Sequence, residues 1–161
     1  MRIREATSDD HDFLLDMLLE AFNWTGEQRF SRAQLLVEPH TDRYLGGWKR
    51  AGDFGLVAVG GAPGVPLGAI WARALAASDA GYGYVADDVP ELGMAVAPEH
   101  RRLGIASALL ARCLEQARGL GWRAVSLSVE EGNRAAKALY TRHGFFAVGR
   151  TGRSDTMLRQ L

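Results

Sequence analysis

The sequence predicts an α/β protein of the α+β type, with a mixed, mostly antiparallel sheet of six to seven strands flanked by about four helices. Short stretches of alternating apolar residues, which are typical of strands, are separated by stretches with apolar residues at helical spacing. One strand–helix–strand unit, residues 91–129, predicts a right-handed crossover between two parallel strands. The other strands are expected to pair antiparallel.

The first fifty residues predict one strand and two helical regions. Residues 2–6 alternate and form a short strand. The segment Thr7-Ser8-Asp9-Asp10 supplies hydroxyl and carboxylate groups that begin a helix, and Asn23-Trp24-Thr25-Gly26 ends it. A second helical region covers residues 31–51, with one break near Pro39, which lacks a backbone donor, and another near Gly46-Gly47.

The middle of the chain predicts an antiparallel hairpin followed by the crossover. The hairpin strands are residues 54–59 and 67–75, and a turn rich in Gly and Pro joins them. After a loop at residues 76–90, a strand at residues 91–97 leads into a helix that ends at Gly119-Leu120-Gly121.

The last forty residues predict a strand, a helix and a closing pair of strands. The strand is residues 124–129, and the helix is capped by Asn133 and ended by Gly144. The closing strands are residues 145–150 and 155–161. The resulting element order is β-α-α-β-β-β-α-β-α-β-β.

Length and composition exclude several classes of protein. A chain of 161 residues with 47% hydrophobic and 24% charged residues fits one globular domain, residues 1–161. Lys+Arg and Asp+Glu both number 19, which argues against a nucleic-acid binder that relies on overall positive charge. The single cysteine, Cys113, excludes an intrachain disulfide and a metal site built on several cysteines. Its apolar neighbours favour a buried, structural role.

The sequence shows no signal peptide and no membrane-spanning run. The first ten residues, MRIREATSDD, have no apolar core, and no apolar run approaches the roughly 18 residues that a transmembrane helix needs. The absence of disulfides fits a reducing compartment. We therefore expect a cytoplasmic protein without a membrane partner.

An anion-binding loop is predicted between the strand at residues 91–97 and the helix after it. Arg101 and Arg102 supply two guanidinium groups, and Gly104 allows the backbone to approach an anion closely. Free N–H groups and the positive end of the helix dipole meet at the same place, which suits phosphate. The alternative is a solvated loop that leads into an ordinary helix.

Two motifs resemble the GNAT superfamily of acetyl-CoA-dependent N-acetyltransferases. Arg101-Arg102-Leu103-Gly104-Ile105-Ala106 fits its R/Q-x-x-G-x-G/A signature. Residues 133–140, NRAAKALY, followed by Gly144-Phe145, are similar to its N-x-x-A-x-x-L-Y-x-x-x-G-F segment. The resemblance covers the C-terminal half closely and the N-terminal half only in element order. It implies a GNAT-like fold, acetyl-CoA as the acyl donor and no metal.

The resemblance also implies which residues contact acetyl-CoA, with the pyrophosphate on residues 101–107 and the pantetheine arm between the strands at residues 91–97 and 124–129. The implied cofactor-binding residues are Met94, Ala95, Val96, Arg101, Arg102, Leu103, Gly104, Ile105, Ala106, Ser107, Asn133, Ala136 and Tyr140. From the residues alone, the small side chains of Gly93, Ala95 and Ala97 equally fit tight packing, and Asn133 equally fits a plain helix cap.

Two residues are predicted to move protons. By the resemblance, the Tyr140 phenol protonates the departing thiolate; a phenol pKa of about 10 against a thiol pKa of about 8.5 allows this as the sulfur gains charge. Glu91, at the start of the central strand, is the candidate general base, directly or through water, because an alkylamine must lose a proton before it attacks. The alternatives are a core aromatic for Tyr140 and a solvent-facing charge for Glu91.

The acceptor is predicted only as a class. Trp24 and Tyr84 are weak candidates for its binding wall, and Asp87 and Asp88 would attract a cation, so that a small cationic amine is slightly favoured. A peptide amine, either a protein N-terminus or a lysine side chain, is an alternative. Another is a non-catalytic domain that only senses acyl-CoA. The sequence leaves the oligomeric state open, a homodimer included.

Overall fold

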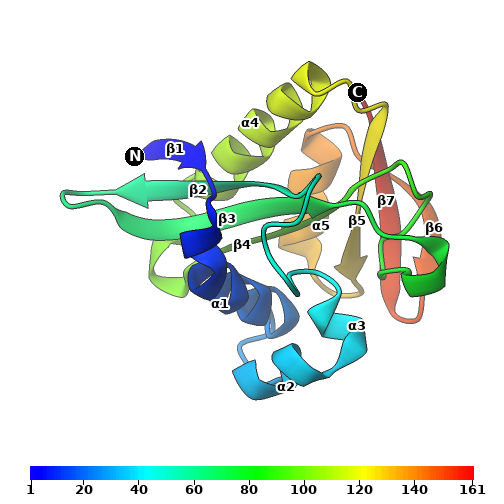
Figure 1. Ribbon diagram of the computed structural model, residues 1–161, viewed down its shortest axis with the longest axis horizontal. Helices are drawn as coiled ribbons and strands as arrows, with labels where there is room; N and C mark the ends of the chain where they lie inside the picture. Colours follow the sequence, from blue (N-terminus) through cyan, green and yellow to red (C-terminus); the bar gives the residue numbers. More distant parts are fainter.

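The computed structural model describes residues 1–161 and contains one seven-stranded sheet with helices on both faces (Figure 1). The strands are β1 (Arg2–Glu5), β2 (Phe54–Gly60), β3 (Val65–Arg73), β4 (Glu91–Val96), β5 (Ala124–Glu130), β6 (Phe146–Thr151) and β7 (Ser154–Gln160). The helices are α1 (His11–Phe22), α2 (Arg32–Val37), α3 (Pro39–Asp42), α4 (Ile105–Gly119) and α5 (Arg134–Arg142). This architecture confirms the predicted fold class and strand order along the chain.

The strands lie in the order β1-β2-β3-β4-β5-β7-β6, and every neighbouring pair is antiparallel except β4 and β5. The β4–α4–β5 unit therefore joins two parallel strands, as predicted for residues 91–129. These strands pair at one position only, Glu91 opposite Ser126, where the Ser126 N–H donates to the Pro90 carbonyl at 3.0 Å. Beyond this position they diverge, and β5 turns away from β4 (Figure 1). The sheet therefore contains a gap at its centre.

Two apolar clusters cover the two faces of the sheet. Helices α4 and α5 pack over one face, to which Leu92 and Val96 of β4 point. Cys113, predicted to be buried, lies in this cluster with no exposed surface. Helices α1 and α2 and the segment after α3 cover the other face, to which Trp71 and Ala97 point. Successive residues of β4 thus contribute to opposite clusters, as strand pleating requires.

The segment after α1 differs most from the prediction. The sequence predicts a helical region over residues 31–51 with breaks near Pro39 and Gly46-Gly47. The structure has two short helices that meet at Pro39, but it has turns rather than helix from residue 43 onward. Ser31 begins α2 by accepting the Gln34 N–H at 3.2 Å, and Pro39 begins α3, because proline is tolerated in the first turn of a helix but not in its interior. None of the helices combines the length and the apolar character needed to cross a bilayer.

A buried ion pair holds the segment after α3 against the sheet. Arg73, at the end of β3, is 2% exposed, and its guanidinium donates to both carboxylate oxygens of Asp53, at 2.8 and 2.6 Å. The same group donates to the carbonyls of Arg43 and Gly46, each at 2.9 Å. Because Arg73 is the β3 partner of Glu91, this cluster fixes the segment beside the first residue of β4.

The substitution Asp53→Ala is expected to lower the free energy of unfolding by about 3–5 kcal/mol, because it leaves the Arg73 charge buried without its counter-ion. Urea denaturation measures the loss. The matched control is Asp88→Ala, which breaks the exposed pair with Arg123 and should cost less than about 1 kcal/mol. Equal losses in the two variants would contradict the role assigned to the buried pair.

Candidate functional site

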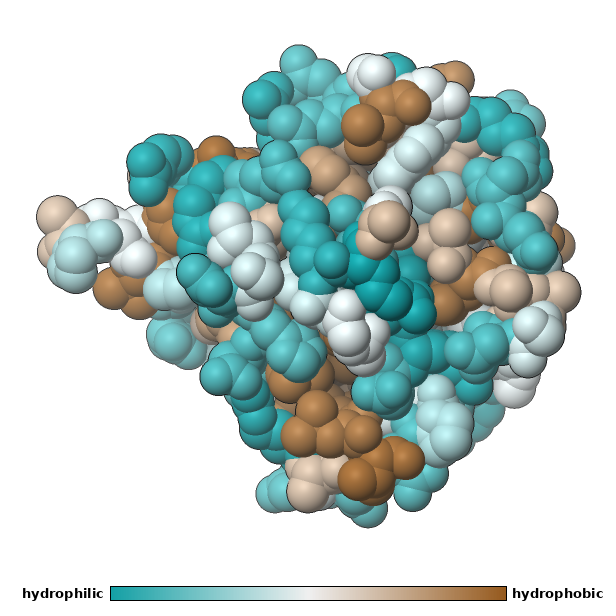
Figure 2. All heavy atoms as spheres, viewed as in Figure 1, coloured by the Kyte–Doolittle hydropathy of each residue, from teal (hydrophilic) through white to brown (hydrophobic).

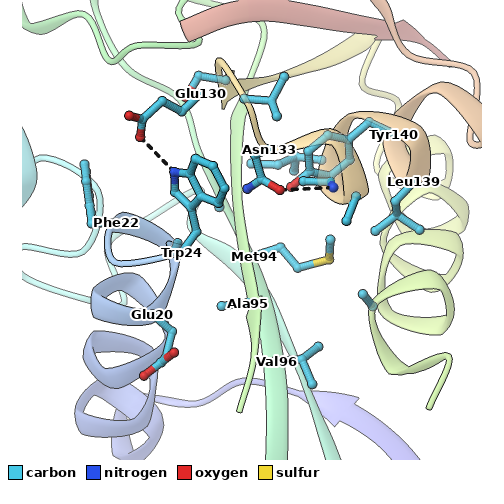
Figure 3. Close-up of a pocket in the computed structure, with 18 of the residues that line it drawn as sticks. Glu20, Phe22, Trp24, Met94, Ala95, Val96, Glu130, Asn133, Leu139 and Tyr140 are labelled. Carbon is cyan, nitrogen blue, oxygen red and sulfur yellow. Dashed lines mark hydrogen bonds between the residues drawn. The ribbon is translucent and has the colours of Figure 1, made fainter. Parts of the chain in front are cut away.

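A cavity of about 1250 Å³ opens where β4 and β5 diverge. Its walls come from α1 and the loop after it, β4, the loop that begins α4, the end of β5, α5 and the turn between β6 and β7. In Figure 3, β4 runs along the cavity, with Trp24 on one side and Asn133 and Tyr140 on the other. The gap in the sheet therefore brings together residues that are far apart in the sequence.

The edge of β4 that faces the gap carries backbone groups without a strand partner. The Ala97 N–H donates to a β3 carbonyl at 2.9 Å, and in an antiparallel ladder such groups alternate between the two sides of a strand. The N–H and C=O groups of Met94 and Val96 consequently point to the β5 side, beyond the single β4–β5 pairing. Those of Ala95 point to β3. Two backbone N–H groups of β4 are thus available to a ligand in the gap.

The loop between β4 and α4 presents an anion-binding surface to the cavity. Arg102 (φ 63°) and Gly104 (φ 80°) adopt left-handed backbone conformations that turn the chain into α4, and such a conformation favours glycine. The N–H groups of residues 105–107 form the first turn of the helix and have no partner within it. Arg101 pairs with Glu20 at 2.8 Å, whereas Arg102 forms no ion pair in the chain.

Most residues that the resemblance assigns to acetyl-CoA line this cavity. They are Met94, Ala95, Val96, Arg101, Arg102, Gly104, Ile105, Ala106, Ser107, Asn133, Ala136 and Tyr140. The exception is Leu103, which is 69% exposed and is not part of the wall. Two arginines of α5 that the sequence patterns do not predict, Arg134 and Arg142, also line it. They lie at the two ends of α5 and add positive charge to the cavity wall.

Helix α5 carries the predicted proton donor. The Asn133 side chain accepts the Ala136 N–H at 3.2 Å, so its role as a helix cap is confirmed. Tyr140 is 8% exposed, and its ring lies against Phe145 with the centroids 5.9 Å apart. Burial raises the pKa of Tyr140 to about 12. Its hydroxyl therefore keeps its proton at neutral pH.

Glu91 is buried in the protein, in contrast to the solvent-facing alternative, and is only 4% exposed. Its Oε1 accepts the Gly83 N–H at 2.9 Å, and its Oε2 is fully buried beside the Tyr44 hydroxyl. Oε2 lies under Gly81, where a Cβ would overlap the carboxylate and approach the Tyr44 hydroxyl. Burial raises the pKa of Glu91 to about 7, although the Gly83 N–H and the Tyr44 hydroxyl oppose the shift. The carboxyl group can thus exchange a proton near neutral pH.

Glu91 and Tyr140 approach the gap from opposite faces of the sheet. Along β4, Glu91 alternates with Leu92 and therefore points to the face that α1, α2 and the segment after α3 cover. Tyr140 belongs to the cluster on the face of α4 and α5. Two reactants could therefore enter the gap from opposite sides and meet between these residues.

Packing explains most of the stripe of small residues on β4. The Trp71 indole occupies the space where a Cβ of Gly93, its cross-strand partner, would lie. Ala97 is buried in the same cluster. The packing alternative therefore accounts for Ala97 and explains why Gly93 has no side chain, while Gly93 and Ala95 both also line the cavity.

The rim of the cavity contains a contact that the sequence patterns do not predict. Trp24 Nε1 donates to Glu130 at 2.9 Å (Figure 3), and the Arg29 guanidinium donates to both Glu130 carboxylate oxygens, at 2.7 and 2.6 Å. This contact, the rim bridge, joins the loop after α1 to the end of β5. Glu130 could have been identified from the sequence, because it lies at the carboxyl end of a strand, where ligands of such sheets bind. Nothing in the sequence around Arg29 indicates its role.

The predicted acceptor residues are not brought together. Trp24 lines the cavity, but Tyr84, Asp87 and Asp88 do not. The Tyr84 hydroxyl donates to Asp87, and Asp88 pairs with Arg123 at 2.6 Å. No group of three or more His, Cys, Asp or Glu side chains is placed to hold a metal ion.

The chain matches the sequence model of the acetyltransferase (GNAT) family over residues 12–145. No curated protein shows significant sequence similarity to it. The family match covers both the loop that begins α4 and the Asn133–Tyr140 segment, the two regions that carry the resemblance.

Solved acetyltransferase structures share the fold. The chain is 24% identical to the ribosomal-protein-alanine N-acetyltransferase of Brucella melitensis, with all of both chains covered and a TM-score of 0.70. It is 19% identical to the PaiA N-acetyltransferase of Thermoplasma acidophilum, solved with coenzyme A, again over all of both chains, with a TM-score of 0.72. A phosphinothricin acetyltransferase of Sinorhizobium meliloti, solved with acetyl-CoA, is 21% identical, with 99% of this chain and 88% of that chain covered and a TM-score of 0.68.

The substitution Glu91→Gln is expected to raise the free energy of unfolding by about 3 kcal/mol at pH 8 and to leave it nearly unchanged at pH 4. The folded pKa of about 7 lies above the ordinary value of 4.5. Folding therefore takes up a proton between these two pH values, and the buried carboxylate costs stability as the pH rises.

Urea denaturation of both proteins across this pH range measures the difference. Glu99→Gln, at an exposed position, is the control and should show no such trend. A difference between the wild type and Glu91→Gln that stays constant from pH 4 to pH 8 would contradict the effect of burial.

Proposed function

This chain belongs to the GNAT family of acetyltransferases, and we propose that it moves the acetyl group of acetyl-CoA to a primary amine by direct attack. The observation that carries the proposal is the cavity at the β4–β5 gap. At one end of β4 the cavity contains the first turn of α4, which suits phosphate. At the other end of β4 lies the buried carboxyl group of Glu91. Two structural neighbours solved with coenzyme A or acetyl-CoA support the choice of donor.

The donor side of the cavity fits the charge of acetyl-CoA. Its pyrophosphate would accept the N–H groups of residues 105–107, which need an external partner. Arg102 lies beside them in the chain with its charge unpaired, and Arg134 and Arg142 line the same cavity. Guanidinium groups bind phosphate oxygens through charge-assisted hydrogen bonds. These groups together would hold the donor against the open edge of β4.

The backbone of β4 is suited to the reacting carbonyl. The Met94 N–H points into the gap, where it has no strand partner. A fixed N–H in a water-poor site stabilises the negative charge that develops on a carbonyl oxygen under attack. We assign the oxyanion position to this N–H, with the Val96 N–H further along the same edge.

The proton transfers follow from the two buried acids. A neutral amine nitrogen attacks the thioester carbon, a C–N bond forms and the C–S bond breaks. Tyr140 gives its proton to the departing thiolate, and the ammonium proton leaves toward Glu91. Because Gly81 and the Tyr44 hydroxyl cover the Oε2 of Glu91, this second transfer passes through the Tyr44 hydroxyl, which lies beside that oxygen and lines the cavity. A carboxyl group with a pKa of about 7 suits a base at neutral pH.

The proposal is tested by thiol release from acetyl-CoA, with and without pooled amines, amino acids, aminoglycosides and peptides. We expect release that depends on one pool. A parallel titration of acetyl-CoA separates the other outcomes. Binding without release from any pool would favour a non-catalytic sensor, and absence of binding would contradict the assignment of the donor.

Tyr140→Phe is expected to lower kcat by about 10²–10⁴-fold, because it removes the proton donor for the thiolate, and to leave acetyl-CoA affinity nearly unchanged. Initial rates of thiol release measure kcat, and a titration with acetyl-CoA measures its affinity. Tyr84→Phe removes a tyrosine hydroxyl outside the cavity and should keep normal turnover. Full activity of Tyr140→Phe would remove Tyr140 from the mechanism.

A further inference from the structure

We propose that the acceptor is a monoamine whose amino group is carried on an aromatic or similarly flat apolar body, of the 2-arylethylamine type. The inference rests on the proposed acetyl transfer and specifies its second substrate. It is drawn from the acceptor end of the cavity, which we define as the wall beside Glu91 on the face that α1, α2 and the segment after α3 cover.

Aromatic rings form a continuous wall at the acceptor end. The Phe22 and Phe30 ring centroids are 5.1 Å apart, and those of Phe22 and Tyr44 are 6.1 Å apart. Tyr82 and Trp71 line the same cavity. Phe22, Phe30 and Tyr82 are only partly buried, so their faces and edges offer apolar surface to a ligand. In Figure 3, Phe22 lies across the cavity from Tyr140. Such a wall matches a flat apolar group.

Only one carboxyl group in the cavity has no cationic partner, so the cavity can pair with one further cation. Three carboxylates line it, and two of these are already neutralised, Glu130 by Arg29 and Glu20 by Arg101. The third, Glu91, forms no ion pair in the chain, and its polar contacts are the neutral Gly83 N–H and Tyr44 hydroxyl. One amino group could therefore be recognised, through the Tyr44 hydroxyl, at the position from which it must also lose a proton.

A polyvalent cation fits this wall poorly. Asp87 and Asp88, the residues that favour a cationic acceptor on sequence grounds, lie outside the cavity. A second ammonium group would lose water against aromatic rings without a free carboxylate, which is unfavourable. The charged side chain at the outer turn, Arg153, adds positive charge. A neutral ring gains from burial instead.

The test compares amines of similar length at saturating acetyl-CoA, with thiol release as the readout. The probes are 2-phenylethylamine, 1,6-diaminohexane, kanamycin and a short peptide with a free N-terminus. We expect kcat/KM for 2-phenylethylamine to exceed each of the others by at least about tenfold. Equal or better use of the diamine, kanamycin or the peptide overturns the acceptor class and leaves acetyl transfer standing. Acetyl-CoA binding without thiol release from any probe overturns acetyl transfer itself.

A variant pair separates recognition of the ring from support of the fold. Phe30→Ala should raise KM for 2-phenylethylamine about tenfold, while KM for acetyl-CoA stays unchanged. The control is Leu36→Ala, which truncates an exposed side chain of α2 outside the cavity and should change neither KM. A Phe30→Ala variant that raises KM equally for 1,6-diaminohexane and 2-phenylethylamine would show that the ring does not recognise the acceptor, and would overturn the proposal.

Discussion

The pairing of β4 with β5 at a single position is the constraint on which the rest of the structure depends. A strand inside a sheet normally satisfies its backbone groups on both sides, and buried groups that lack a partner are costly. Here the sheet is continuous up to Glu91 and Ser126, and beyond them the β4 edge at Met94 and Val96 has no neighbouring strand. Water or a ligand must satisfy this edge. The gap thus turns backbone groups that would only hold the fold together into a binding surface.

The two faces of the sheet contribute different chemical groups to the gap. The face of α4 and α5 supplies positive charge, a helix start and the phenol of Tyr140. The opposite face supplies aromatic rings and the carboxyl group of Glu91. Each buried acid is held in an apolar cluster, and this burial raises the pKa of both. The same packing that stabilises the sheet therefore also sets the proton affinity of the groups at its gap.

Local signals in the sequence group the residues that we assign to the donor. Gly104 and the arginines before it are adjacent in the chain, and Asn133 and Tyr140 lie on one short helix, so their spacing alone places them. The acceptor side depends on contacts between distant segments. Glu91 is buried because the loop that contains Gly81 and Gly83 passes over it, and no periodic pattern encodes that path.

The same dependence on distant contacts explains why some predicted residues lie away from the cavity and why one region was harder to predict. Asp87 and Asp88 are near Glu91 in sequence, but they lie outside the cavity, because closeness along a loop does not determine direction. The region at residues 31–51 has apolar residues without a regular period, and its turns depend on tertiary contacts such as those of Arg73 with Arg43 and Gly46. Element type was thus predictable where periodicity was strong, and the course of the loops was not.

The rim bridge has a consequence for motion. Its contacts join residues 106 and 101 positions apart, and Arg29 and Glu130 keep 32% and 25% of their side-chain surface exposed. Side-chain contacts of this kind contribute about 1 kcal/mol or less, and none of them belongs to a backbone ladder. Rupture of the rim bridge alone would therefore cost a small fraction of the free energy of global unfolding. Opening of the rim would therefore require no strand of the sheet to separate from its neighbours.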